Sequence, residues 1–441
     1  LNGFIKWNSD NLQPKYRENM KLYLSEHDIL YDDPKEFGPD NRLVANLAKY
    51  IIDTYNGYSF GVAPKIILDK GDNNDSLQDW LSHVSFFDKL NELGKQTSIY
   101  GRSIGYVYQN ENAETEFTYV SPSKAFIIYD NTVNREPLAF VMYEYYKNES
   151  EWQARGKIYY ATKVYDFDNL KLSDEYTINP YKIVPAVEFY ENEERQGVLD
   201  PVKTLLNAYD KVLSQKANQN EYFDNAYLAA IGIKFPINPK TKKPDIDIAN
   251  NRFLYLPDVT QGTNPKLEFI SKPDNDNMQE NYLKRLEDLI YQVSMVPNLN
   301  DQAFAGNQSG VALQYKLLSL QNKTANQVRK FKKSLRQLFR VIFSVGQVVN
   351  NPDLWDQLSI EFHPNLPADI AGAISDAKNV EGLVSQRTAL KLLPFVSDPD
   401  EEIKQINQEK QENIKNAQQA AGSLPDYLND GEDDDDKSET E

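Results

Sequence analysis

The chain has 441 residues, of which 40% are hydrophobic and 26% charged, and it carries a formal net charge of −18 at pH 7. That length accommodates two or three domains with sizeable apolar cores. The absence of cysteine excludes disulfides, thiolate catalysis and cysteine-ligated metals, and three histidines are too few to favour a histidine metal cluster or a histidine-based triad.

The acidic surplus disfavours tight, sequence-independent binding of nucleic acid by the whole surface, because such binding requires neutralisation of phosphates. No apolar run reaches the roughly 18 residues that span a bilayer, so no membrane partner is expected. The first residues, LNGFIKWNSD, lack a basic stretch followed by an apolar one, so no signal peptide is predicted. An interior, reducing compartment is therefore expected.

The first hundred residues predict helices separated by turns. Asp40 is the expected N-cap of a helix that continues through YIIDTY, because a carboxylate can accept hydrogen bonds from the free N–H groups at a helix start. A second helix is predicted over LQDWLSHVSFFDKLNELGKQ and is expected to end near Gly94.

From Thr97 to Tyr190 the sequence changes to β-branched and aromatic runs, which begin with SIYGRSIGYVYQ and end with AVEFYE. Polar breaks separate the runs, so this region predicts an antiparallel meander of strands. Three glutamates, Glu191, Glu193 and Glu194, follow the last run. They could be paired carboxylates for glycoside chemistry, but a solvated charge run before a helix is the favoured interpretation.

Two helices and an insert follow. Asp200 and Pro201 are predicted to open the first helix, and the second spans about 277–296 and is stopped by Pro297. Between them lies a small β-rich insert. Its basic tip consists of Lys240, Lys242 and Lys243.

A long helix after Ser309 is purely basic. No acidic residue occurs from Gln302 to Pro352, whereas eight basic residues do. An apolar seam at heptad-like spacing is also present, made of Val328, Phe331, Leu335, Leu338, Ile342 and Val345. The basic residues are either an ordinary solvated face or a face that meets something negative, namely acidic neighbouring subunits or nucleic acid.

No catalytic residue, metal site or cofactor is predicted. Gly94-Lys95-Gln96-Thr97 lacks the first glycine of a phosphate-binding loop and has glutamine directly after the lysine. The stretch GDNNDS lacks the glycine and the glutamate that a calcium-binding EF-hand loop requires. The chain is therefore not expected to be an enzyme.

The C-terminal part predicts helices and then an acidic tail. Asp398 is the expected cap of a helix with Pro399 at its first position. Residues 430–441 contain eight acidic residues and one lysine, a composition that predicts disorder. The sequence DDDDK in this tail matches a common engineered cleavage sequence, but it continues into SETE, which favours a natural tail.

Five stretches, taken in order, resemble tailed-bacteriophage portal proteins of the SPP1-like type. The resemblance lies in the ordered set rather than in any single motif. The stretches are Tyr50–Pro64 (YIIDTYNGYSFGVAP), Ile99–Tyr108 (IYGRSIGYVY), Asp200–Leu228, Ser309–Lys323 and Gly382–Glu412.

The resemblance implies an α+β, portal-type fold with long stem helices, an antiparallel β-rich wing, a small α/β clip insert and a helical crown. It implies the following division of the chain. The wing comprises 1–199 and 310–368, the stem helices 200–226 and 277–296, the clip 227–276, the tunnel loop 297–309, the crown helices 369–429, and the acidic tail 430–441.

The resemblance also implies a homo-oligomeric ring, usually of twelve subunits, at one capsid vertex of the virion, assembled in the host cytoplasm. Double-stranded DNA would be packaged and ejected through the ring. The implied protein partners are the terminase large subunit, a head-completion or adaptor protein, and the scaffolding and major capsid proteins.

Site residues follow from the same mapping. The implied DNA-facing groups of the tunnel loop are Asn298, Asn300, Asp301, Gln302, Asn307 and Gln308. Lys240, Lys242 and Lys243 are assigned to partner binding at the clip. The basic helix is assigned to contacts between subunits first and to DNA second, through Lys323, Arg329, Lys330, Lys332, Lys333, Arg336 and Arg340.

One alternative comes from a different class of protein. A soluble nucleic-acid-binding structural module would use the basic helix 323–340 directly on DNA, and its affinity would depend strongly on salt.

Overall fold

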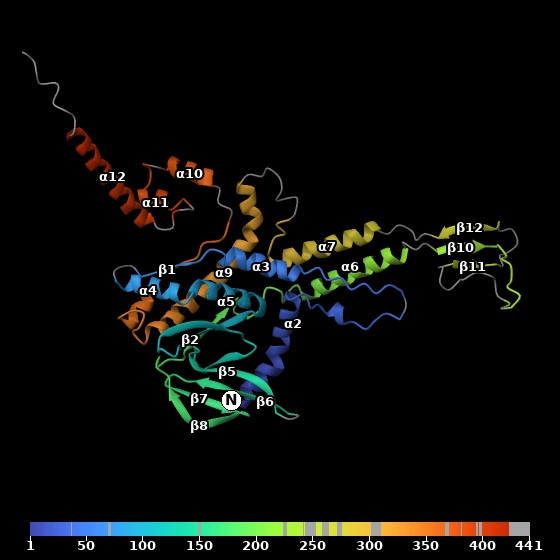
Figure 1. The fold of residues 1–441 in the computed structure, drawn as a ribbon, viewed down its shortest axis with the longest axis horizontal. Helices are drawn as coiled ribbons and strands as arrows, with labels where there is room; N and C mark the ends of the chain where they lie inside the picture. The colour runs from blue at the N-terminus through green and yellow to red at the C-terminus, as the bar shows by residue number, and fades with distance from the viewer. Residues whose placement is uncertain are drawn as a thin grey trace, which may run out of the picture. The chain divides into compact units, whose positions relative to one another are not determined.

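In the computed structural model the fold is α+β (Figure 1). The chain divides into two compact units, Leu1–Asn365 and Leu366–Glu441. The residues that the structure describes are 1–36, 38–68, 72–148, 151–223, 227–240, 242, 253–257, 264–270, 276–300, 310–366, 370–380, 382–393, 396 and 399–422.

The first unit begins with helices, as predicted, but the predicted N-cap is wrong. The cap of α3 is Asn46, whose side chain accepts the backbone N–H of Lys49 at 2.8 Å. Asp40 instead accepts a hydrogen bond from Arg42 at 2.9 Å. The elements are α1 (Asn2–Trp7), a π-helical turn η1 (Asn8–Leu12), α2 (Gln13–Tyr23), a 3-10 turn η2 (Asp28–Tyr31) and α3 (Leu47–Phe60).

The next helices are α4 (Asp72–His83) and α5 (Phe86–Tyr100). The predicted helix end near Gly94 is wrong, because α5 continues to Tyr100 and includes residues that were predicted to start the first strand. Gly101 ends α5 with φ +83°, a conformation that favours glycine. A Cβ atom at this position would also lie 2.2 Å from the carbonyl oxygen of Arg195. Glycine is therefore required here both for its φ angle and for the close approach of the backbone.

The strand-rich region forms two sheets rather than one meander. Five strands pair antiparallel in chain order, as a meander does: β4 (Ala125–Tyr129), β5 (Pro137–Asn148), β6 (Glu151–Tyr159), β7 (Lys163–Asp168) and β8 (Lys171–Ile178). The other sheet has the order β3-β2-β9, made of β2 (Arg102–Gln109), β3 (Thr115–Val120) and β9 (Ala186–Tyr190). Because Arg102 pairs with Tyr190, this second sheet joins segments that are far apart in the sequence.

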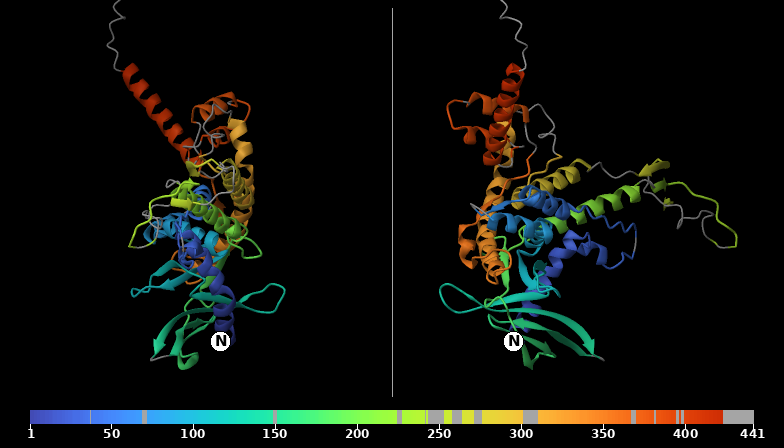
Figure 2. Two further views of the ribbon diagram at one scale, coloured as in Figure 1. Left: turned by 90° about the vertical axis from the view of Figure 1, so that its right-hand side faces the viewer. Right: turned by 60° about the vertical axis from the view of Figure 1, so that its left-hand side comes forward.

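Two long helices, α6 (Lys203–Phe223) and α7 (Asp276–Ser294), lie side by side (Figure 1 and Figure 2). Lys216 of α6 forms an ion pair with Glu280 of α7. The chain between these helices carries β10 (Tyr227–Ile231), β11 (Phe253–Leu256) and β12 (Lys266–Ile270) in the order β11-β10-β12. The pairing is parallel between β10 and β11 and antiparallel between β10 and β12. The described part of this insert contains strands and no helix.

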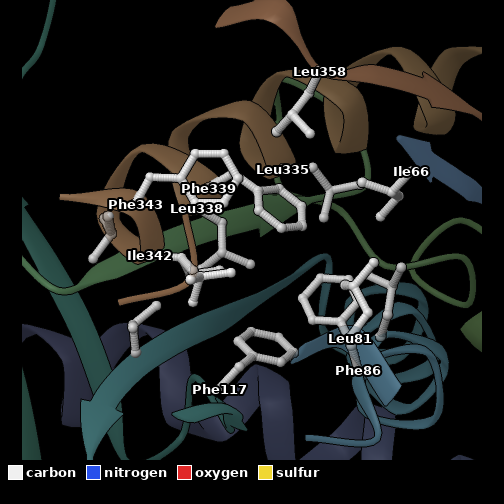
Figure 3. Packing of buried hydrophobic residues seen from close by; sticks show 14 of the residues in the cluster. Ile66, Leu81, Phe86, Phe117, Leu335, Leu338, Phe339, Ile342, Phe343 and Leu358 are labelled. Atoms are coloured by element: carbon white, nitrogen blue, oxygen red, sulfur yellow. The ribbon is translucent and has the colours of Figure 1, made fainter. Parts of the chain in front are cut away.

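The longest helix, α9 (Gly310–Phe343), forms one wall of the main core of the first unit (Figure 3). Leu335, Leu338 and Ile342 of the predicted seam are fully buried there and pack in the same cluster as Phe86 and Phe117. The seam is therefore used inside the chain. Near the end of α9 lie the 3-10 turn η3 (Pro352–Gln357) and a two-stranded sheet of β1 (Lys65–Ile67) and β13 (Ser359–Glu361).

The second unit is helical in its described residues. It contains α10 (Ile370–Asn379), α11 (Gln386–Leu390) and α12 (Pro399–Gly422). Ser385 caps α11 by accepting the backbone N–H of Thr388 at 3.3 Å. The last helix begins at Pro399, the predicted first position.

Candidate functional site

The chain that leaves α7 is held to α7 and α3 before it reaches residue 301. Asn298 donates a side-chain hydrogen bond to Oε1 of Glu287 at 3.0 Å, and its own Oδ1 accepts the backbone N–H of Asn300 at 3.1 Å. The backbone N–H of Leu299 donates to the hydroxyl of Tyr50 on α3 at 2.9 Å. Of the predicted loop residues, only Asn298 and Asn300 are described. Outside the described residues lie Asp301, Gln302, Asn307 and Gln308.

The basic residues of α9 separate into two stripes. The first, which we call the outer stripe, consists of Arg329, Lys333, Arg336 and Arg340, whose spacing of four, three and four places them on one helical face. All four are exposed. Arg329 binds the side chain of Asn326 one turn away, and Arg340 lies over the ring of Trp355. The outer stripe is a coherent, positively charged surface, and Lys332 lies at its edge.

The second stripe, the inner stripe, consists of Lys316, Lys323 and Lys330 at intervals of seven residues. Lys330 forms an ion pair with Glu193, and its ammonium lies 5.8 Å from the centre of the Tyr190 ring. Lys323 reaches the backbone carbonyl oxygen of Ser294 at 3.0 Å. The single basic face expected from the sequence is thus two faces, one directed to solvent and one to the chain's own acids and carbonyl groups.

A buried polar network surrounds Glu191, which is only 5% exposed. Tyr55 donates to Glu191 Oε1 at 2.7 Å, and Gln327 donates to Oε2 at 2.6 Å. Burial raises the pKa of Glu191 to about 7, although the charge of Lys323 and these two hydrogen bonds oppose that rise. Burial also lowers the pKa of Lys323, and Glu191 opposes that change.

This network corrects the interpretation of the glutamate run. Glu193 and Glu194 are exposed, as a solvated run requires, but Glu191 is not. The chain turns directly after β9, where Glu191 N donates to the carbonyl oxygen of Gly101 at 3.0 Å. The first glutamate therefore points into the core between α3 and α9.

A groove of about 920 Å³ runs along α6 and α7. It brings together residues from both helices with Leu43, Pro297, Asn298 and Lys316. The polar lining contains both signs of charge, so the groove does not select one class of ion. Its helical lining consists of Tyr209, Leu213, Lys216, Ala217 and Asn220 of α6 and Glu280, Leu283, Lys284, Glu287, Asp288 and Tyr291 of α7.

The predicted basic tip of the insert is described in part. Lys240 and Lys242 are exposed, whereas Lys243 lies outside the described residues. The backbone N–H of Lys240 donates to Oδ1 of Asn238 at 3.0 Å, and Lys242 has φ 53°. Both lysines thus belong to a tight turn at the surface.

Within the described residues, no group of three or more histidine, aspartate, glutamate or cysteine side chains is arranged to hold a metal ion. No helix among these residues has the length and apolarity that crossing a membrane requires.

Sequence reasoning missed one buried charged pair. Nδ1 of His27 hydrogen-bonds Oδ2 of Asp210 on α6, and Nε2 lies 3.0 Å from the carbonyl oxygen of Leu22. Both side chains are 1% exposed. Burial lowers the pKa of His27, but the hydrogen bond to Asp210 and its charge outweigh this effect and raise the pKa above 6.5. No motif in the sequence links the two residues, so this pair could be found only from the fold.

The comparisons with known proteins agree over most of the chain. The sequence model of the family described as phage portal protein, SPP1 Gp6-like, matches residues 2–416. The portal protein of Bacillus phage SPP1 is 24% identical over 435 residues, which cover 89% of this chain and 83% of that protein. The portal protein of Clostridium phage phiCD119 is 24% identical over 398 residues, which cover 84% and 85% of the two chains.

Proposed function

The chain belongs to the SPP1 Gp6-like phage portal protein family, and we propose that its copies form the ring at the capsid vertex through which double-stranded DNA is packaged and ejected. The observation that carries this proposal is the extent of the family match, from residue 2 to residue 416. Because this match includes both units and the insert, the whole chain is assigned one role. In this role the ring is structural and works with a packaging motor, rather than being an enzyme itself.

The pair α6 and α7 suits the stem of such a ring. The helices lie side by side, and the strands of 227–275 occupy the chain between them, where a clip is expected. The exposed Lys240 and Lys242, together with Lys243, give this insert a basic tip. We propose that this tip binds acidic surfaces of the terminase large subunit and of the head-completion or adaptor protein.

The loop 297–309 suits a conduit for DNA because its composition disfavours tight binding of phosphates. It contains no basic residue and one acidic residue, Asp301. Each strong phosphate contact would resist sliding, since breaking it costs free energy at every step. We assign the side-chain amides of Asn300, Gln302, Asn307 and Gln308 to transient contacts with DNA. The side chain of Asn298, which binds Glu287, contributes by shaping the start of the loop.

We assign the outer stripe of α9 first to contacts with an acidic surface of the neighbouring copy. Each copy carries a net charge of −18, so a ring brings negative surfaces together and requires positive groups between them. The exposure of Arg329, Lys333, Arg336 and Arg340 supports this assignment. The inner stripe is excluded from it, because Lys323 and Lys330 are engaged within the chain.

The mapping gives the remaining parts their roles. Residues 1–199 and 310–368 form the wing, and 369–429 the crown, with the acidic tail at 430–441. The scaffolding and major capsid proteins are the expected partners of the assembled ring at the vertex. Twelve copies are the expected number.

Light scattering of the purified protein tests the ring. We expect a mass of many protomers that persists on dilution to micromolar concentration. A clean monomer at high protein concentration would count against the proposed function.

A further inference from the structure

Two side chains from different elements hold the chain at the start of the loop 297–309. Lys323 of α9 donates from its ammonium to the carbonyl oxygen of Ser294, the last residue of α7, at 3.0 Å. The hydroxyl of Tyr50 on α3 accepts the backbone N–H of Leu299 at 2.9 Å. One contact holds the end of the helix and the other holds the chain that leaves it.

The position of Lys323 is explained by the end of α7. The last carbonyl groups of a helix have no partner within the helix and carry the negative end of its dipole, so an ammonium group is favoured there. Ser294 is fully buried, and water therefore cannot replace the lysine easily. The ammonium also lies 5.4 Å from the centre of the Tyr55 ring, whose hydroxyl binds Glu191.

The Lys323 contact joins the two helices between which the loop is inserted. Ser294 ends α7, and Lys323 lies on α9, which begins at Gly310. The contact therefore ties the end of α7 to a point on α9 that lies thirteen residues after the start of that helix. Tyr50 adds a second link to α7 from a third helix, α3. Its ring packs edge-on against the ring of Tyr291 on α7, with 5.9 Å between the ring centres.

We propose that Lys323 and Tyr50 are positioning residues for residues 295–300, which lead into the loop 297–309, because they hold the C-terminus of α7 and the backbone of Leu299 against α9 and α3. We assign them no contact with DNA; they act through Ser294 and Leu299. The proposal rests on the proposed function only for the role of the loop. The contacts themselves belong to the folded protomer.

Hydrogen–deuterium exchange of the full chain, read by mass spectrometry on peptides that cover 295–300, tests the proposal. A hydrogen bond to a charged group changes an opening equilibrium by about tenfold or more. We therefore expect about tenfold faster exchange in Lys323→Met. Tyr50→Phe removes the hydroxyl and keeps the ring; because it removes a neutral hydrogen bond, we expect exchange about two- to tenfold faster. The matched control is Lys333→Met on the outer stripe, which removes one charge from the same helix and should leave this exchange unchanged.

A double variant separates positioning from simple charge balance. If Lys323 served only to neutralise Glu191, Lys323→Met combined with Glu191→Gln would restore slow exchange. We expect exchange at 295–300 to stay fast in this double variant, because the contact with Ser294 is still missing. Restored exchange in the double variant, or wild-type exchange in both Lys323→Met and Tyr50→Phe, would overturn the proposal.

The outcome of the exchange experiment does not depend on whether the proposed function is correct. Exchange is measured on the folded chain whatever its oligomeric state, whereas the ring is measured by mass. If the protein is a monomer and its Lys323→Met variant exchanges rapidly, the proposed portal role is contradicted and the positioning role of the contacts is supported. If Lys323→Met does not fold, the Tyr50→Phe variant decides alone.

Discussion

Tyr55 on α3 donates its hydroxyl hydrogen to Oε1 of Glu191 at 2.7 Å, across 136 residues of sequence. Gln327 on α9 binds the second oxygen of the same carboxylate at 2.6 Å. One buried glutamate thus ties the end of β9 to two helices. The side-chain oxygen Oε1 of Gln327 is buried and has no hydrogen-bond partner among the described residues. Both carboxylate oxygens of Glu191 are therefore hydrogen-bonded, whereas the amide of Gln327 is only partly so.

The buried carboxylate predicts a dependence of stability on pH. The folded-state pKa of Glu191 is about 7, against 4.5 for the free side chain. The folded chain therefore binds more protons between these values, and its free energy of unfolding falls as pH rises from 4.5 to about 7. We expect Glu191→Gln to gain up to about 3 kcal/mol relative to the wild type over this interval.

Denaturant unfolding at pH 5 and pH 8 measures this difference. The control is Glu193→Gln, which changes an exposed glutamate two residues away whose pKa is lowered by its hydrogen bond to Lys330. Parallel pH profiles for the wild type and Glu191→Gln would contradict the assignment of Glu191 as a buried titrating group.

The pair of His27 and Asp210 predicts a further loss of stability at higher pH. Because the pKa of His27 is raised above 6.5, its stabilising charge is fully present below that pH and is lost as pH rises through the folded-state pKa. Breaking a buried pair on one side costs about 3–5 kcal/mol. We expect His27→Gln to lose stability of this order at pH 6 and less at pH 9, measured by denaturant unfolding.

His363 supplies the control for that experiment. Its side chain is 59% exposed, and Oε2 of Glu361 lies 4.0 Å from its Nε2. His363→Gln should leave the free energy of unfolding within about 0.5 kcal/mol of the wild type at both pH values. A loss as large as that of His27→Gln would mean that the pair with Asp210 is not the cause.

The helices and strands were largely predictable, because they depend on periodicity along a short segment. The helix start at Pro399 and the burial of Leu335, Leu338 and Ile342 are confirmed. The pairing of β2 with β9 was not predictable, since Arg102 and Tyr190 meet through tertiary packing. The N-cap failed for a local reason: Asp40 and Asn46 have similar capping chemistry, and only the path of the chain selects Asn46.

The α9 seam predicts a stability effect that is independent of protein concentration. Leu338 is fully buried in the core of its own chain, so Leu338→Ala should cost about 2–5 kcal/mol of unfolding free energy. Leu318 on the same helix is 48% exposed and provides the matched control, with an expected loss below about 1 kcal/mol. A Leu338→Ala variant of unchanged stability but reduced assembly mass would place the seam between copies instead.

The outer stripe predicts a salt-sensitive assembly. Changing Arg329, Lys333 and Arg336 to glutamine should lower the mass measured by light scattering at moderate salt while the fold is kept, because positive groups between acidic copies are lost. The control changes three exposed lysines of the strand-rich region, Lys124, Lys147 and Lys171. DNA affinity that collapses in the first variant, with an unchanged mass, would favour the alternative of a nucleic-acid-binding module.

The basic helix also shows where sequence reasoning ends. The sequence shows eight basic residues and no acidic residue from Gln302 to Pro352, but it does not show which way each side chain points in the folded protein. Lys323 faces inward because the end of α7 offers a carbonyl group, and Lys330 turns toward Glu193. Both partners lie in other elements, so only the fold separates these lysines from the outer stripe.

The central claim is that copies of this chain form a ring around a channel. Negative-stain electron microscopy of the purified chain tests it most directly. We predict annular particles with a central, stain-filled opening in end-on views. Compact particles without an opening, of the size of a single chain at every concentration used, would contradict the account.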